Sequence, residues 1–180
     1  MTGEKYHSFG SVMPHEVLSM PLISAKAQNI VLAHGHHIPT VVVESSYGTA
    51  QVNIERLADT HEEKAQQFFT IGFLLAESSE VGVLHQIFFI SEAWLTRSDK
   101  ETQQSSRLDK QRMEALIISR TQLEPFAKEL LILEMLRNAE QKVIELKPHI
   151  HMLETDKQLV ESPLVEAFIG GYIRGLMNIK

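Results

Sequence analysis

The histidines of this sequence gather in two short segments, and metal coordination is the chemistry that their spacing could support. The segments LAHGHHIPTVVVE and KPHIHML contain five of the nine histidines: His34, His36, His37, His149 and His151. A bound metal ion needs three or four ligands at about 2.0–2.1 Å. His149 and His151 would point the same way on a strand. A third ligand for His34 and His36 could come from this second segment or from Glu44.

A structural explanation accounts for more of the first segment. Gly35 directly follows a predicted helix, where a left-handed C-cap favours glycine. His34 lies in the last turn of that helix, where a protonated imidazole interacts favourably with the helix dipole. His36 and His37 then connect the cap to a strand. Because no known zinc-protease or deaminase spacing occurs, the sequence favours a helix end without a cofactor, and a divalent metal is the alternative.

Glu92 and Trp94 are the other candidate site residues. They lie in SEAW, at the end of a predicted central strand, and share one face by the two-residue period. The ends of central strands often carry binding sites. The pair could therefore form the rim of a pocket or a partner surface, or simply an aromatic lid over the core. His85 lies earlier in the same strand, and we expect it to be a buried core histidine with a hydrogen-bond partner.

The first histidine segment lies between a predicted helix and a predicted hairpin. The helix ends near Ala33, with Ser19 as its N-cap and Pro21 in its first turn. Its apolar residues recur at three- and four-residue spacing, which gives one buried stripe. IPTVVVES is rich in β-branched residues and TAQVNIE alternates strictly, so both are predicted strands, joined at SSYG.

A second helix and the central strand follow the hairpin. In DTHEEKAQQFFTIGFLLAESS, Thr60 and Glu63 have the spacing of a capping box. VGVLHQIFFISEAWL is apolar on both faces, which indicates a central strand that is covered on both sides. A right-handed crossover through the helix would make this strand parallel to the second strand of the hairpin.

The later part of the chain contains one ambiguous stretch. Residues 96–110 are polar and predict a surface loop, and MEALIISR predicts a strand. Residues 127–147 are rich in helix formers, yet NAEQ resembles a turn and KVIELK alternates. Two strands are favoured here over one helix.

The last predicted helix contains three glycines. Ser162 would cap it and Pro163 would take its first position. Each glycine weakens a helix by about 1 kcal/mol relative to alanine. We therefore expect close packing of this helix against the sheet or a partner.

Together these elements predict an α+β fold. Its mixed, mainly antiparallel sheet would have five or six strands, with about three helices lying mostly on one face. Residues 1–13 would be loosely ordered, and residues 14–180 would form a single domain.

The composition excludes several classes of function. The chain has 180 residues and no cysteine, which excludes disulfides, thiolate catalysis, iron–sulfur clusters and cysteine-bound zinc. Its formal net charge of −6 disfavours nucleic acid as a partner. The sequence starts without a signal-peptide pattern, and its apolar runs are too short to span a membrane. We therefore expect an acidic, cytoplasmic protein.

No motif identifies a specific activity, so two classes of function are considered. The first is a non-enzymatic interaction or regulatory domain that has a protein partner or self-associates. A homodimer through the glycine-bearing helix or a sheet edge fits this class. The alternative is a metal-dependent or histidine-based hydrolase, which requires the two histidine segments to converge beside a carboxylate.

The order of the segments resembles a family of uncharacterised bacterial proteins of similar length. The similar parts are the step from His36 to Pro39 into a strand, THEEKAQ, FFISEAW and SPLVEAF, within a region from about residue 20 to residue 176. The resemblance implies no activity. It supports two strands in residues 127–147.

Overall fold

A computed structural model describes residues 17–78, 81–95, 112–154 and 163–178 of the protein. The predicted loose segment 1–13, the predicted loop 96–110 and the predicted cap Ser162 lie outside these described residues.

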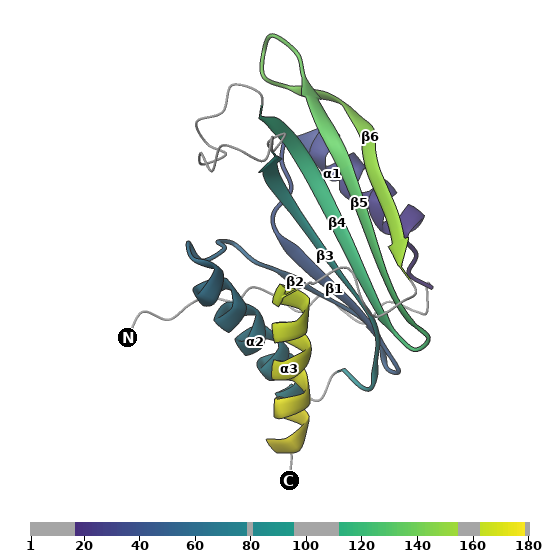
Figure 1. The fold of residues 1–180 in the computed structure, drawn as a ribbon, viewed down its shortest axis with the longest axis vertical. Coiled ribbons are helices and arrows are strands. Elements are labelled where there is room, and N and C mark those ends of the chain that lie inside the picture. Colours follow the sequence, from purple (N-terminus) through teal and green to yellow (C-terminus); the bar gives the residue numbers. More distant parts are fainter. Residues whose placement is uncertain (1–16, 79–80, 96–111, 155–162, 179–180) are drawn as a thin grey trace.

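The described residues contain one six-stranded sheet in the order β2-β1-β3-β4-β5-β6 (Figure 1). Its strands are β1 (Thr40–Ser45), β2 (Gly48–Asn53), β3 (Leu84–Leu95), β4 (Met113–Leu123), β5 (Phe126–Arg137) and β6 (Val143–Glu154). The predicted α+β class is confirmed, although every neighbouring pair is antiparallel rather than mixed. β3 runs parallel to β2 as expected, but β1 lies between the two.

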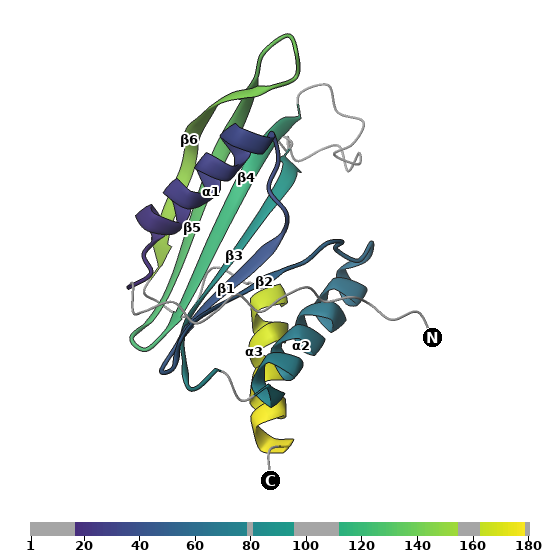
Figure 2. The same cartoon turned by 180° about the vertical axis from the view of Figure 1, so that it is seen from behind.

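The three helices pack on both faces of the sheet. α2 (His61–Glu77) and α3 (Pro163–Asn178) contact one face, and α1 (Met20–His34) contacts the other. Figure 2 shows α1 lying along the sheet, apart from α2 and α3. Two of the three helices therefore share a face, and α1 forms a separate layer.

Two cores follow from the alternation of side chains along the strands. On the α1 face, Ile23, Ala27 and Val31 pack against the sheet. The strand residues in this core are Val42, Phe88, Ile90, Leu116, Ile118, Leu133, Met135, Val143 and Leu146. On the opposite face, Val41, Val43 and Ile87 pack with α2 and α3.

The glycines of α3 meet α2 rather than the sheet or a partner. A Cβ atom added to Gly171 would lie 1.9 Å from the backbone oxygen of Phe69. One added to Gly72 of α2 would lie 2.1 Å from the backbone oxygen of Phe168. The two helix backbones are in direct contact, which explains the predicted need for close packing.

The predicted helix ends are confirmed where the structure describes them. The Ser19 hydroxyl accepts a hydrogen bond from the Leu22 N–H, and Gly35 adopts a left-handed conformation with φ of 81°. Thr60 and Glu63 form the full capping box. Residues 127–147 form parts of two strands, β5 and β6. None of the helices in the described part of the chain is long and apolar enough to cross a membrane.

Candidate ligand pocket beside helix α1

A cavity of about 450 Å³ lies between α1 and the β1–β2 side of the sheet. α1 and the residues at its two ends, β1, β2 and Ile90 of β3 contribute to its lining. Seven lining residues are buried: Leu18, Ile23, Ala27, His37, Thr40, Val42 and Ile90. Five of these seven are aliphatic, so the interior of the cavity is apolar.

The first histidine segment forms one end of this cavity. His34, His36 and His37 all line it. His36 and His34 are exposed, and Nδ1 of His36 lies 3.1 Å from the His34 carbonyl oxygen. Gly35 caps α1 between them, as predicted, and its N–H donates to the Val31 carbonyl at 2.7 Å. The segment is therefore a helix end that also borders a pocket.

His37 is the buried member of the segment. Its Nδ1 lies 2.6 Å from the Ile38 carbonyl oxygen, which can only accept, so this nitrogen carries the hydrogen. Its backbone N–H donates to Oε1 of Glu92 at 2.5 Å. Burial lowers the pKa of His37, and nearby His36 lowers it further, whereas the bond to Ile38 opposes the shift. Burial therefore favours the neutral form of this imidazole.

Neither Glu92 nor Trp94 is part of the lining of the cavity. Burial raises the pKa of the half-buried Glu92, and the carboxylate of Glu114 adds to this effect, whereas the His37 N–H opposes it. The Trp94 ring is exposed at its surface, and the guanidinium of Arg112 lies 4.2 Å from the ring centre. Glu92 supports the pocket through the His37 backbone.

Arg137 fixes the end of α1 to the sheet. Its guanidinium donates to both carboxylate oxygens of Glu114 at 2.6 Å. It also donates to the carbonyl oxygens of Gly35 at 3.1 Å and Gln141 at 2.8 Å. Hydrogen bonds to Glu114 raise the pKa of Arg137, so its guanidinium stays protonated. These hydrogen bonds of Arg137 hold the histidine end of the cavity in place.

The second histidine segment lies on β6, at the opposite edge of the sheet from β2. His149 is exposed there, and Nε2 of His151 lies 2.8 Å from Oε1 of Glu129. Neither residue lines the cavity. Among the described residues, no group of three or more histidine, aspartate or glutamate side chains could hold a metal ion. The structure does not bring the two segments together.

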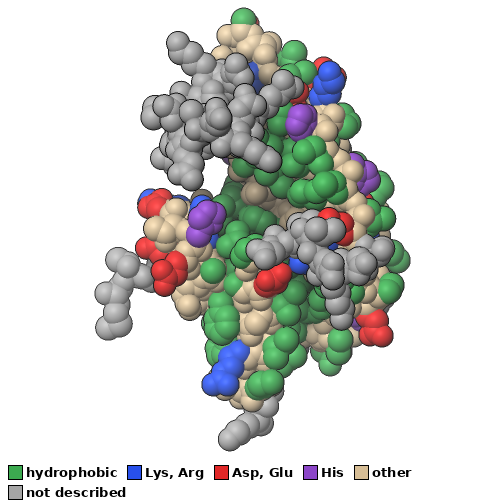
Figure 3. Space-filling view, viewed as in Figure 1, with side chains coloured by type: hydrophobic (Ala, Val, Ile, Leu, Met, Phe, Trp, Pro, Cys, Tyr) green, Lys and Arg blue, Asp and Glu red, His purple; other side chains and the backbone are tan. Residues whose placement is uncertain are grey.

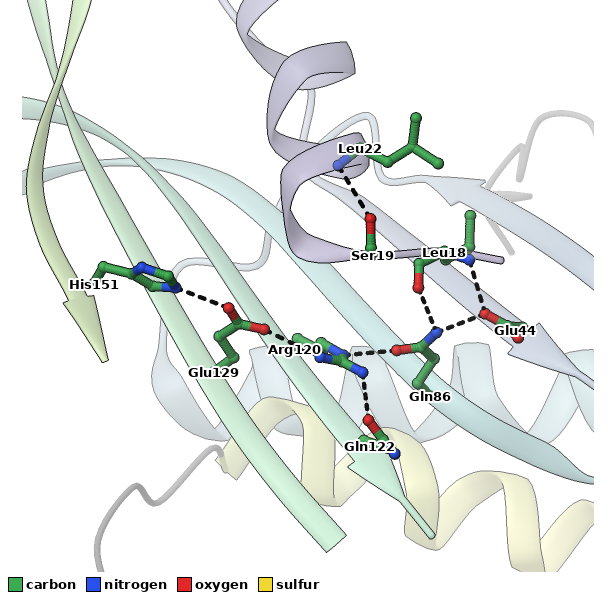
Figure 4. Close-up of polar contacts among 9 residues, drawn as sticks. All are labelled: Leu18, Ser19, Leu22, Glu44, Gln86, Arg120, Gln122, Glu129 and His151. Atoms are coloured by element: carbon green, nitrogen blue, oxygen red, sulfur yellow. Dashed lines mark hydrogen bonds and ion pairs between the residues drawn. The ribbon is translucent and has the colours of Figure 1, made fainter. Parts of the chain in front are cut away.

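A row of polar side chains crosses five strands on the α1 face, and the sequence analysis missed it (Figure 4). Its members are Glu44, Gln86, Arg120, Glu129 and His151. Arg120 donates to Oε1 of Gln86 at 2.7 Å and to Oε2 of Glu129 at 3.1 Å. Polar residues on otherwise apolar strand faces were the available signal.

This polar row also holds the chain just before α1. The side-chain amide of Gln86 donates to the Leu18 carbonyl at 2.9 Å and to Glu44 at 2.6 Å. The Leu18 N–H donates to the same carboxylate oxygen of Glu44 at 3.2 Å. Because Leu18 lines the cavity, the row positions the wall opposite the histidine end.

Comparisons with known proteins do not assign this protein to a family. No family model matches the sequence, and no curated protein or solved structure is significantly similar to it. The resemblance to uncharacterised bacterial proteins therefore stays a prediction.

A buried hydroxyl in the described lining of the cavity belongs to Thr40. The Thr40 hydroxyl lies 2.7 Å from the Ile38 carbonyl oxygen and 3.2 Å from Oδ1 of Asn53, so it is engaged as a donor. The expectation for His85 is wrong, because this residue is exposed rather than part of the core.

Proposed function

We propose that this protein is a non-enzymatic, ligand-binding regulatory domain whose ligand is a small, largely apolar molecule. The observation that carries the proposal is the cavity of about 450 Å³ with its buried aliphatic lining. Ligand pockets typically measure about 300–1,000 Å³, with apolar walls and a few positioned polar groups. Arg137 at one end and Gln86 at the other keep the cavity walls preformed.

A hydrolase is the less favoured alternative. It would need the two histidine segments to converge, or a nucleophile beside a base. His151 is instead paired with Glu129, and His37 donates to a carbonyl oxygen. No observation on the described residues favours this alternative over binding.

The cytoplasmic location and the protein partner or homodimer expected from the sequence remain proposals. Exposed apolar side chains on α3 and on the edge strand β6 support an interaction surface, since such residues often mark contacts. They include Ile173, Leu176 and Met177 of α3 and Ile144, Met152 and Leu153 of β6. Figure 3 shows hydrophobic side chains gathered over the sheet and along α3.

The ligand-binding proposal is tested with a neutral apolar probe, octanol, and isothermal titration calorimetry. Ala27 is 1% exposed and lines the cavity, so Ala27→Leu places three extra carbon atoms in the space. Ala33 is exposed on the same helix and is not part of the lining, so Ala33→Leu is the matched control. We expect octanol to bind the unmodified protein and Ala33→Leu, and Ala27→Leu to bind it at least 10-fold more weakly.

Two results would contradict this proposal. The first is no detectable binding of octanol to the unmodified protein. The second is equal binding to both variants, provided that circular dichroism shows Ala27→Leu to be folded. Because Ala27 borders the cavity, the extra carbon atoms of Ala27→Leu should cost less than the roughly 1–3 kcal/mol typical of overpacking a filled core.

A further inference from the structure

We propose that the ligand of this cavity is an amphipathic anion, with an apolar chain in the interior and one carboxylate at the histidine end. The inference rests on the proposed function, because it names the chemical class of the molecule that occupies the same cavity. A medium-chain monocarboxylate is the simplest member of this class.

The charge of the lining carries the inference. None of the described residues that line the cavity is an aspartate or a glutamate. The four ionisable side chains in the lining are all bases: Lys26, His34, His36 and His37, of which His37 is the buried, neutral one. The whole chain has the opposite balance, with 23 acidic against 17 basic residues. A cavity that presents only bases in an acidic protein favours a negatively charged ligand.

The carboxylates near the cavity are held by other groups. Glu92 accepts the His37 N–H, and Glu114 accepts two hydrogen bonds from Arg137. Glu44, at the other end, accepts from Gln86 and from the Leu18 N–H. These acids therefore stabilise the walls, and they are not part of the surface that a ligand would contact.

The distribution of polar and apolar groups separates a head from a tail. Ile23, Ala27 and Ile90 are at most 5% exposed, so they suit a hydrocarbon chain. His34 and His36 are exposed, so a charged head beside them keeps part of its hydration. The cavity volume of about 450 Å³ lies within the range of about 300–1,000 Å³ that is typical of small-molecule pockets.

The lining also favours a singly charged head over a phosphate. None of the described lining residues is an arginine. Arginine supplies the paired N–H donors that bind phosphate in a bidentate way. The exposed imidazoles of His34 and His36 present single, separate nitrogens rather than a planar fork of N–H groups, which suits a carboxylate better than a phosphate.

The test compares three probes that share one chain: octanoate, octanol and octylamine. Calorimetry on the full chain should give at least 10-fold tighter binding of octanoate than of octanol, and the weakest binding for octylamine. Ile30 lines the cavity and is 42% exposed, so Ile30→Glu adds a carboxylate at the mouth. We expect it to weaken octanoate binding at least 10-fold and octanol binding no more than about 3-fold.

Leu32→Glu is the matched control, because Leu32 is 38% exposed on the same helix and does not line the cavity. It should leave both affinities within about 2-fold. If octanol binds and octanoate binds no better, the anion inference is overturned and the proposed function stands. If neither binds, both are overturned. If Leu32→Glu weakens octanoate as much as Ile30→Glu does, the effect is one of net charge and the inference fails.

Discussion

At the scale of single residues, His37 makes the stability of the pocket depend on pH. Its folded-state pKa lies below the ordinary value of about 6.5, because burial disfavours the cation. The unfolded chain therefore takes up a proton more readily than the folded one. The free energy of unfolding is therefore unaffected by His37 above about pH 6.5, and it decreases as the pH falls from there toward the lowered pKa.

Replacing His37 by asparagine should remove this pH-dependent loss. The asparagine amide can still donate to the Ile38 carbonyl but does not titrate. In urea unfolding, the His37→Asn variant should therefore gain stability relative to the unmodified protein as the pH falls from 7.5 to 5.5. The other histidines are common to both proteins, so their contributions cancel in the difference. A difference that stays constant with pH would contradict the assignment.

Glu92→Gln is an internal control with the opposite sign. Burial raises the folded-state pKa of Glu92 above its ordinary value. The free energy of unfolding therefore falls as the pH rises from the ordinary pKa toward the raised one. Glutamine keeps an oxygen that can accept the His37 N–H. The Glu92→Gln variant should therefore gain stability relative to the unmodified protein as the pH rises from about 4.5.

At the scale of elements, the contact between α2 and α3 depends on glycines, because the two helix backbones lie too close together for a side chain. A methyl group at Gly171 would overlap the Phe69 carbonyl, and that backbone atom cannot move aside alone. We expect Gly171→Ala to destabilise the protein by about 3 kcal/mol or more, measured by urea unfolding. The two helices would have to separate to relieve the overlap.

Gly170→Ala is the matched control, one position earlier in the same helix. Its added Cβ would lie 3.9 Å from the nearest atom, a ring carbon of Phe69. The substitution should be neutral or stabilising by up to about 1 kcal/mol, because alanine favours a helix over glycine. Equal effects of the two substitutions would show that helix propensity, rather than close packing, governs these positions.

The features that the sequence alone predicted correctly are those that depend on residues close together in the chain. Ser19, Gly35 and the Thr60–Glu63 capping box each act within a few residues of the chain, so their roles follow from spacing. Residues 127–147 were ambiguous because their helix propensity conflicts with strand pairing, of β5 with β4 and of β6 with β5, and tertiary pairing overrides propensity. Which element packs against the α3 glycines could not be predicted, because Phe69 and Gly171 are far apart in sequence.

At the scale of the whole molecule, the pocket results from how one helix is placed on a sheet face. α1 packs with residues of β1 and β3 to β6, and the cavity remains between α1 and β2. The sequence located the histidines at the helix end correctly. It could not reveal the cavity, because Gln51 and Asn53 of β2 border it only through the hairpin fold. Arg120 was missed for the same reason, since its partners lie on other strands.

Arg120 provides the last prediction, because it joins β3, β4 and β5 within one polar row. Its side chain is 21% exposed and that of Glu129 is 11% exposed, so Arg120→Met should leave a largely buried carboxylate with a weaker set of partners. We expect a loss of about 2–3 kcal/mol in urea unfolding, and partial recovery in Arg120→Met with Glu129→Met. Arg56→Met is the control, because the Arg56–Asp59 pair is 82% and 83% exposed and should change stability by less than about 0.5 kcal/mol. If Arg120→Met costs no more than Arg56→Met, the row does not hold the strands together, and the preformed wall at Leu18 must have another cause.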